Sequence, residues 1–358
     1  MNKFIATYQG HLGKAACIAA LASVHPVSAV ELPTLPDNFH VVYRLSPSTP
    51  APKAEVDLLL GLAGLPSPQG LGQTVGVTAT VSRIFGKEQF VVNPLRPTNF
   101  FSLDQSNRAM SFSRDLKRYE GDFEPVLPDE DEAEQIAKEY LTENELMPEL
   151  RQEEAMVTAA VQTVAGARPA VKGRAPGKDD QPVAFDKLKV LTFTRKINGL
   201  PVVGPGSKIV VTLGDGGDVE GLIHRWRSFT PPVTTAAKSA RSSTKATTRL
   251  PETITPQAAL TGMKARLATQ FPNKSDAQRE AMIQDMDLAY YDSNVGAIQP
   301  VYVFRLDLGS NIAGPSPTTG PREDYVTFAP YLKVAPEAIY VFGDLPNSPA
   351  PRAQTQPN

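Results

Sequence analysis

Three stretches of this chain repeat one order of sequence patterns, in which a helical stripe of apolar residues precedes several alternating strands. Helical spacing runs through residues 52–63, 129–141 and 255–271. Strict alternation, cleanest at 74–81, is typical of half-buried strands. A helix that precedes antiparallel strands covers one face of their sheet. The order therefore predicts an α+β fold of repeated helix-plus-antiparallel-sheet units joined by flexible linkers.

Short local signals mark the ends of several of these elements. Asp129 with Glu132 resembles a capping box, and Thr255 before the proline at 256 is a good helix start. The pair at 198–199, Asn-Gly, is the strongest hairpin signal in the chain because both residue types accept the positive φ angles of a tight turn. Residues 155–164 are predicted to form a strand.

The N-terminus has the three parts of a secretory signal peptide. Lys3 and Lys14 supply positive charge. Residues 15–24 form an unbroken run of apolar or small residues, and 27–29 offer small residues for cleavage. The run is too short to span a bilayer as a helix, and its alternative interpretation is a buried helix at the start of the fold. Cys17 is the only cysteine and lies in this run, so we expect the exported chain to use no disulfide.

Composition and pattern divide the chain into six expected segments. They are a signal peptide at 1–29, an N-terminal α+β unit at 30–120, a second α+β unit at 121–229, a flexible linker at 230–250, a third α+β unit at 251–345 and a disordered tail at 346–358. Whether the first unit is a true repeat of the other two stays open.

The charge balance excludes one class of partner. The chain has 36 basic and 38 acidic residues, whereas nucleic-acid binding requires a basic face. No stretch after the signal peptide is long and apolar enough for a transmembrane helix. The chain is therefore expected to be secreted or periplasmic and to bind no nucleic acid, and its oligomeric state stays open.

Residues 187–226 follow a pattern of strand, Asn-Gly-hydrophobic-Pro-Val, strand, Asp-Gly and strand, and a helical stretch precedes them. This pattern resembles the PepSY and thermolysin-propeptide-like repeats. The third unit is similar in layout, through its helix and the strands at 288–291 and 299–304, and the first unit matches in element order. The resemblance implies cystatin-like α+β units, which restrain peptidases or bind other extracytoplasmic proteins. No peptidase domain follows in this sequence, so we expect any restraint to act in trans.

A search for chemistry finds no catalytic, cofactor or metal site. After the signal region the only histidines are His40 and His224, and neither lies in a zinc-binding motif. The sequence has no nucleophile elbow and no phosphate-binding loop. The acidic residues at 129–134 are expected to start a helix, and the Gly/Asp-rich segment 214–218 is expected to be a hairpin turn.

Five aromatic residues are the candidate partner-binding residues. In alternating strands such side chains are most often core residues, but an exposed cluster would form a platform for a peptide or glycan. The candidates are Trp226, Tyr290, Tyr291, Tyr302 and Phe304.

The leading hypothesis is an exported, non-catalytic protein-binding or regulatory protein that binds another exported protein, with a peptidase acting in trans as the partner that the resemblance implies. Contact would occur through a sheet edge or an open sheet face, since edge pairing needs no special side chains. Two alternatives stay open. One is a structural component of an extracellular surface assembly, and the other is a secreted hydrolase that uses paired carboxylates.

Overall fold

The computed structural model describes residues 30–49, 51–65, 79–84, 87–92, 100–120, 123–167, 184–230, 252–307 and 325–336. The α-helices are α1 (Lys53–Leu62), α2 (Glu130–Glu143), α3 (Pro256–Gln270) and α4 (Asp276–Glu280), with short 3-10 turns at Leu116–Tyr119 and Asp215–Gly217. The strands are β1 (Tyr43–Arg44), β2 (Ala79–Ile84), β3 (Lys87–Val92), β4 (Phe100–Asp104), β5 (Met110–Ser113), β6 (Glu154–Ala167), β7 (Ala184–Ile197), β8 (Leu200–Val203), β9 (Lys208–Leu213), β10 (Val219–Arg225), β11 (Ile283–Asp292), β12 (Ala297–Leu306) and β13 (Tyr325–Pro330).

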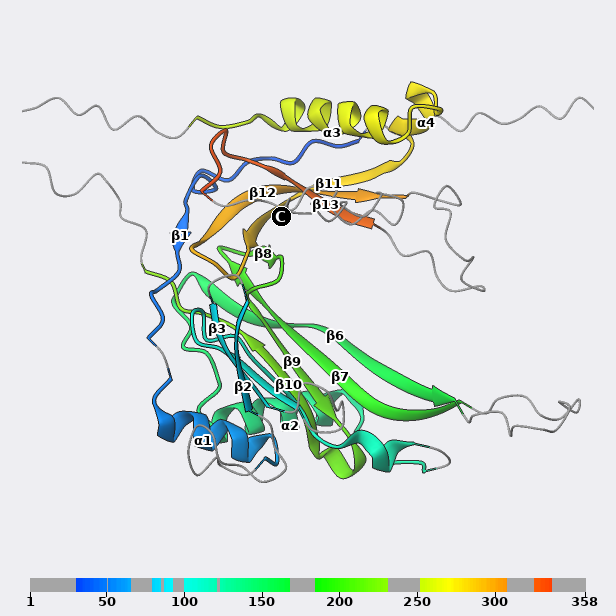
Figure 1. Ribbon diagram of the computed structural model, residues 1–358. Helices are drawn as coiled ribbons and strands as arrows, with labels where there is room; N and C mark the ends of the chain where they lie inside the picture. The colour runs from blue at the N-terminus through cyan, green and yellow to red at the C-terminus, as the bar shows by residue number, and fades with distance from the viewer. Residues whose placement is uncertain are drawn as a thin grey trace, which may run out of the picture.

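The described strands join in one mixed β-sheet of 13 strands, which has two parts. The large leaf has the order β6-β7-β9-β10-β5-β4-β3-β2, and all its neighbours are antiparallel. The small leaf consists of β11, β12 and β13, with β1 added to β12. Strand β8 joins the leaves, since it pairs antiparallel with β7 and parallel with β11. Figure 1 shows the small leaf beneath α3 and the large leaf below it.

The expected fold class, α+β with repeated helix-plus-antiparallel-sheet units joined by flexible linkers, is wrong. The structure is a β-rich molecule built on one large mixed sheet, because strands from all three stretches hydrogen-bond to one another. Strand β5 of the first stretch pairs with β10 of the second, and β1 pairs with β12 of the third. Alternation in a sequence indicates that a strand has one buried face, but it does not indicate which strand lies beside it.

The expected segment boundaries stay a prediction, although strands pair across those placed at 120 and 250. The signal peptide at 1–29, the linker after residue 230 and the tail at 346–358 lie outside the described residues. Most of the strand expected at 74–81 also lies outside them.

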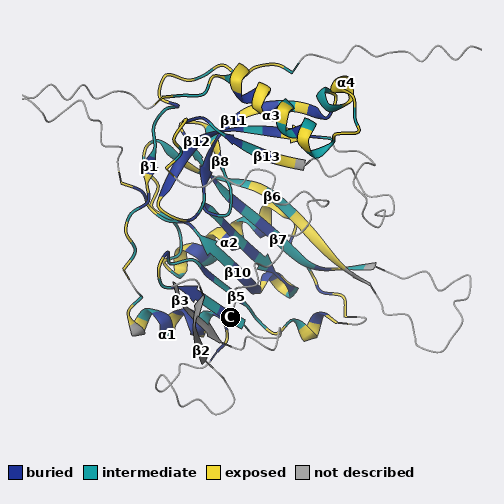
Figure 2. Cartoon of the chain, turned by 45° about the horizontal axis from the view of Figure 1, so that its top comes forward, coloured by how far each residue is buried: buried dark blue, intermediate teal, exposed yellow. Residues whose placement is uncertain are grey.

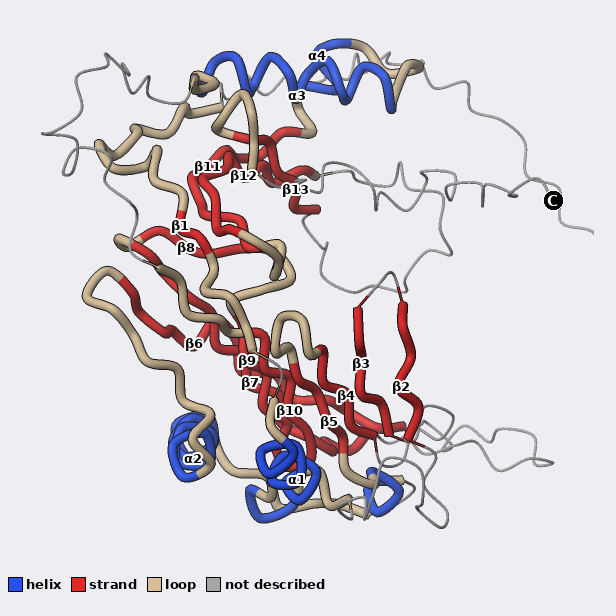
Figure 3. Tube along the Cα trace, turned by 60° about the vertical axis from the view of Figure 1, so that its left-hand side comes forward, coloured by secondary structure: helices blue, strands red, loops and turns tan. Residues whose placement is uncertain are grey.

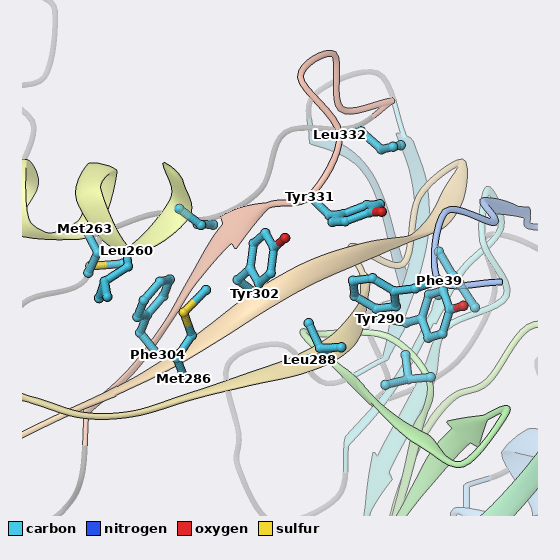
Figure 4. Close-up of a cluster of buried hydrophobic side chains, with 14 of the residues drawn as sticks. Phe39, Leu260, Met263, Met286, Leu288, Tyr290, Tyr302, Phe304, Tyr331 and Leu332 are labelled. Carbon is cyan, nitrogen blue, oxygen red and sulfur yellow. The ribbon is translucent and has the colours of Figure 1, made fainter. Parts of the chain in front are cut away.

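Each leaf buries its own core against helices. In the large leaf, α1 and α2 cover one face and contribute Leu60 and Ala137 to a core with Phe101 and Phe193. Figure 3 shows both helices on the same side of this leaf, with α2 toward β6. In the small leaf, α3 covers a core that includes Phe304, which Figure 4 draws. Burial of these apolar faces is the main stabilising contribution to the fold.

Local predictions hold where they depend on a few neighbouring residues. The Asp129 side chain accepts a hydrogen bond from the Glu132 amide (2.8 Å), and Thr255 caps α3 with Pro256 at its first position. The Asn-Gly turn connects β7 to β8 with positive φ at both residues (50° and 80°), as expected for a tight hairpin. The Gly/Asp segment at 214–218 forms the turn between β9 and β10.

Candidate partner-binding edge

The five aromatic candidates are buried. Trp226 is 8% exposed, Tyr291 is 1% exposed and the remaining three are fully buried. Trp226 belongs to the core of the large leaf, and Tyr290, Tyr302 and Phe304 belong to the core beneath α3. Tyr291 lies on the other face of the small leaf. The structure therefore brings three of them into one core and does not assemble the five into an exposed platform.

Their contacts are those of packed core residues. Tyr290 lies edge-on to Phe39 (ring centroids 5.7 Å apart) and to Tyr43 (5.4 Å). Tyr302 packs edge-on against Tyr331 (5.8 Å), and its hydroxyl donates to the Ile254 carbonyl (2.7 Å). These contacts add orientation-dependent attraction to the burial of the rings. A partner could contact these side chains only if the core opened.

Strand β6 forms one edge of the large leaf among the described strands. It runs for 14 residues and pairs with β7 along its whole length. Strands β8 and β9 occupy the opposite side of β7, and no other described strand pairs with β6. Figure 2 shows exposed residues along this strand. The outward-facing N–H and C=O groups of β6 are thus open to pairing as far as the structure describes the chain.

The composition of β6 gives little protection against pairing with another chain. The 13 residues from Ala155 to Ala167 include no charged residue and no proline. Proteins usually protect exposed edges with lysine, proline or bulges. Here the ladder with β7 has two register shifts, at 158–160 and 164–165, and is regular between them. Gln162, Thr163 and Val164 lie in this stretch and are exposed.

Helix α2 flanks β6 on the core side of the leaf and is acidic. Its sequence contains six carboxylates and one lysine, Lys138. Glu134 accepts hydrogen bonds from Lys138 and from Thr158 of β6, and these bonds hold the pKa of the Glu134 carboxyl below its usual value. Asp131, Glu134 and Glu139 line a shallow hollow of about 360 Å³ together with Gln135 and Lys138. Because Glu134 lines the hollow and also contacts β6, the hollow lies beside the open edge.

A buried ion pair lies at the inner end of β6. The side chains of Arg195 and Glu154 are 0% and 2% exposed, and Arg195 Nε is 3.2 Å from Glu154 Oε1. Arg195 also donates to the Arg227 carbonyl (2.6 Å) and lies 4.4 Å from the Trp226 ring centroid. Burial lowers the pKa of the Arg195 guanidinium to about 10, although the nearby carboxylates of Glu154 and Asp292 oppose this shift. The pair holds the start of β6 against β7.

A second buried carboxylate lies where β8 meets β11. Asp292 accepts from the Ser207 hydroxyl (2.5 Å) and from the Asn294 amide (2.7 Å). Burial raises the pKa of the Asp292 carboxyl, and these hydrogen bonds and the positive charge of Arg195 reduce the shift. A Cβ atom at Gly206 would clash with the Asp292 carboxylate, so a larger residue there would force that side chain to shift. The cluster connects the loop after β8 to the end of β11.

The histidines and acidic residues considered for chemistry have structural partners. His224 Nε2 lies 3.0 Å from the Leu146 carbonyl, and burial lowers the pKa of its imidazole. Within the described residues, no three His, Cys, Asp or Glu side chains form a group that could hold a metal ion. None of the helices in the described part of the chain is both long enough and apolar enough to cross a membrane.

Sequence reasoning predicted β6 as a strand but did not identify it as an edge. The signal that points to it is the long run without charge or proline at 155–167, in the strand that follows an acidic helix. That run of residues predicts neither which side of the strand is unpaired nor which strands lie beside it.

The comparisons with known proteins assign this chain to no family. The chain matches no family model, and no curated protein matches it. The resemblance to PepSY repeats therefore stays a prediction. A solved structure of an uncharacterized protein from Eubacterium rectale ATCC 33656 aligns over 80% of this chain and 82% of its own, at 10% sequence identity and a TM-score of 0.39. A similarity at this level carries no argument about fold or function.

Proposed function

We propose that this protein is an exported, non-catalytic binding or regulatory protein that holds an extended segment of another protein by strand addition at the β6 edge. The observation that carries the proposal is that no described strand pairs with the outer side of β6, whose residues 155–167 include no charged residue and no proline. In strand addition, main-chain hydrogen bonds supply affinity and alternate side chains supply specificity. The resemblance of residues 187–226 to PepSY repeats supports an extracytoplasmic partner, with a peptidase as one candidate class.

The rest of the fold is suited to this role. Strand β6 is fixed along its inner side by β7 and at its start by the buried pair of Glu154 and Arg195. A rigid edge costs less ordering entropy when a partner binds than a flexible one does. The incoming segment would therefore be ordered on a strand that is already in place.

The test uses proline at two neighbouring positions, Gln162→Pro and Thr163→Pro. Both residues lie in the regular part of the ladder, where successive amides point alternately toward β7 and away from it. Proline at the inward position removes a ladder bond and lowers thermal stability, whereas proline at the outward position leaves the fold intact and blocks only an added strand. Thermal unfolding identifies the outward variant.

The wild-type protein and the outward variant are then compared with a displayed library of random 12-residue peptides. We expect the wild type to enrich peptides that the outward variant does not retain. We also expect bound peptides to protect β6 amides from hydrogen exchange. Equal retention by both proteins, or no enrichment by the wild type, would contradict strand addition at β6.

A further inference from the structure

We infer that the segment bound at the β6 edge is basic, with lysine or arginine on the side chains that face α2. This inference rests on the proposed strand addition and adds the chemistry of the partner. An added strand would lie about 4.8 Å outside β6, and its side chains would project alternately toward the helix side and toward the open face of the leaf. On the helix side α2 brings carboxylates to the edge, because Glu134 accepts from Thr158 of β6, whereas on the open face β7 places Lys196 opposite Ala155.

On the helix side of the edge α2 contributes the carboxylates, and Lys189 of β7 lies opposite Thr163 farther along β6. Asp131 and Glu134 lie three residues apart on α2, so they occupy one face of the helix. That face is the one next to β6, because Glu134 accepts from the Thr158 hydroxyl. Lys138 already pairs with Glu134, and among the described residues no cation lies within ion-pairing distance of Asp131 or Glu139. A basic side chain that entered the hollow would meet uncompensated carboxylates.

A second copy of this chain fits the same edge poorly. Two β6 strands paired about a twofold axis would form an isologous interface, in which each α2 approaches the other. Each helix carries six carboxylates and one lysine, so the two would repel. The same charge attracts a basic segment and disfavours an acidic one. Charge complementarity therefore favours a basic strand over self-pairing.

The experiment uses three synthetic 12-residue peptides that share threonine or valine at alternate positions and carry lysine, glutamine or glutamate at the others. Fluorescence anisotropy gives the dissociation constant of each peptide for the purified full chain at low salt. We expect the lysine peptide to bind about tenfold more tightly than the glutamine peptide, and the glutamate peptide to bind weakest. Raising the salt concentration should reduce the advantage of the lysine peptide.

Two matched double variants locate the effect. Asp131→Asn with Glu134→Gln removes two carboxylates from the face beside β6, and Glu132→Gln with Glu143→Gln removes two carboxylates that point away from it. We expect the first pair to abolish the preference for lysine over glutamine and the second pair to preserve it. Equal affinity of the wild type for the three peptides would overturn the inference, as would equal effects of the two double variants.

The outward proline variant separates this inference from the proposed function. If that variant loses all three peptides while the wild type binds them equally, strand addition holds and the basic preference is wrong. If the lysine peptide binds the wild type and the proline variant equally well, the contact is with α2 alone and strand addition is wrong. No binding of any peptide to the wild type would contradict both.

Discussion

Arg195 is the residue on which the inner end of the candidate edge depends. Its side chain is fully buried on β7, on the same face as the apolar core residues Leu191 and Phe193. A guanidinium in such a place requires a carboxylate and hydrogen-bond acceptors, because an unpaired buried charge is very costly. Glu154, the first residue of β6, supplies the carboxylate. The charge of Arg195 therefore fixes the position at which β6 begins.

Replacing Glu154 with glutamine is expected to destabilise the fold by about 3–5 kcal/mol, because it leaves Arg195 buried without a counter-charge. The free energy of unfolding in urea measures the effect. Adding Arg195→Met to the same chain should recover part of the loss. The control is Lys138→Ala, which removes an exposed pair with Glu134 and should cost less than about 1 kcal/mol. A loss of similar size in Lys138→Ala and Glu154→Gln would contradict the role given to the buried pair.

At the scale of elements, the open edge should be detectable by hydrogen exchange in the protein without a partner. Amides that point toward β7 are hydrogen-bonded, whereas amides that point outward from β6 are not, so neighbouring residues should differ sharply in hydrogen exchange. We expect this alternation at Gln162 and Thr163, between the two register shifts. Exchange followed by nuclear magnetic resonance measures it, and the β7 residues paired on both sides, such as Leu191, serve as the protected control. Strong protection of both Gln162 and Thr163 would mean that another segment covers the edge.

The elements differ in how far the sequence predicted them, and the difference follows from the range of the interactions involved. The caps at Asp129 and Thr255 and the turn at 198–199 depend on residues a few positions apart, and they were predicted correctly. Strand β1 depends on a partner about 250 positions away in β12, and nothing in its own residues indicates that pairing. The fold class was wrong for this reason, since it assumed that each run of strands pairs within itself.

The candidate site was missed for a related reason. A strand was predicted at residues 155–164, and β6 covers this range and extends slightly beyond both ends. What makes β6 a candidate site is the absence of a described neighbour on one side, which depends on the order of all the other strands. The aromatic candidates, such as Tyr290, were chosen for residue type, and the same alternating pattern that drew attention to them places them in the core.

At the scale of the whole molecule, the two leaves are connected through a short strand. Strand β8 has four residues, yet it pairs with β7 of the large leaf and with β11 of the small leaf. The cluster of Ser207 and Asp292 adds buried hydrogen bonds at the same junction, and Asn198 donates to the Tyr43 hydroxyl (2.9 Å). Ile197 and Val202 from this hairpin are buried in the core beneath α3. Loss of either leaf would expose this shared surface.

The leaves are therefore expected to unfold together. Phe304→Ala removes a fully buried ring from the small-leaf core and should cost about 3–5 kcal/mol. Trp226 is the only tryptophan and lies in the core of the large leaf, so its fluorescence reports a leaf that the substitution does not touch. Cooperative unfolding predicts that Phe304→Ala lowers the urea midpoint measured by Trp226 fluorescence.

The control is Leu58→Ala on the outer side of α1, which is 54% exposed and should leave that midpoint nearly unchanged. If the leaves unfolded as separate domains, the Trp226 midpoint would stay at its wild-type value while far-ultraviolet circular dichroism showed an earlier transition. That outcome would mean that the junction at β8 is too weak to couple the two leaves.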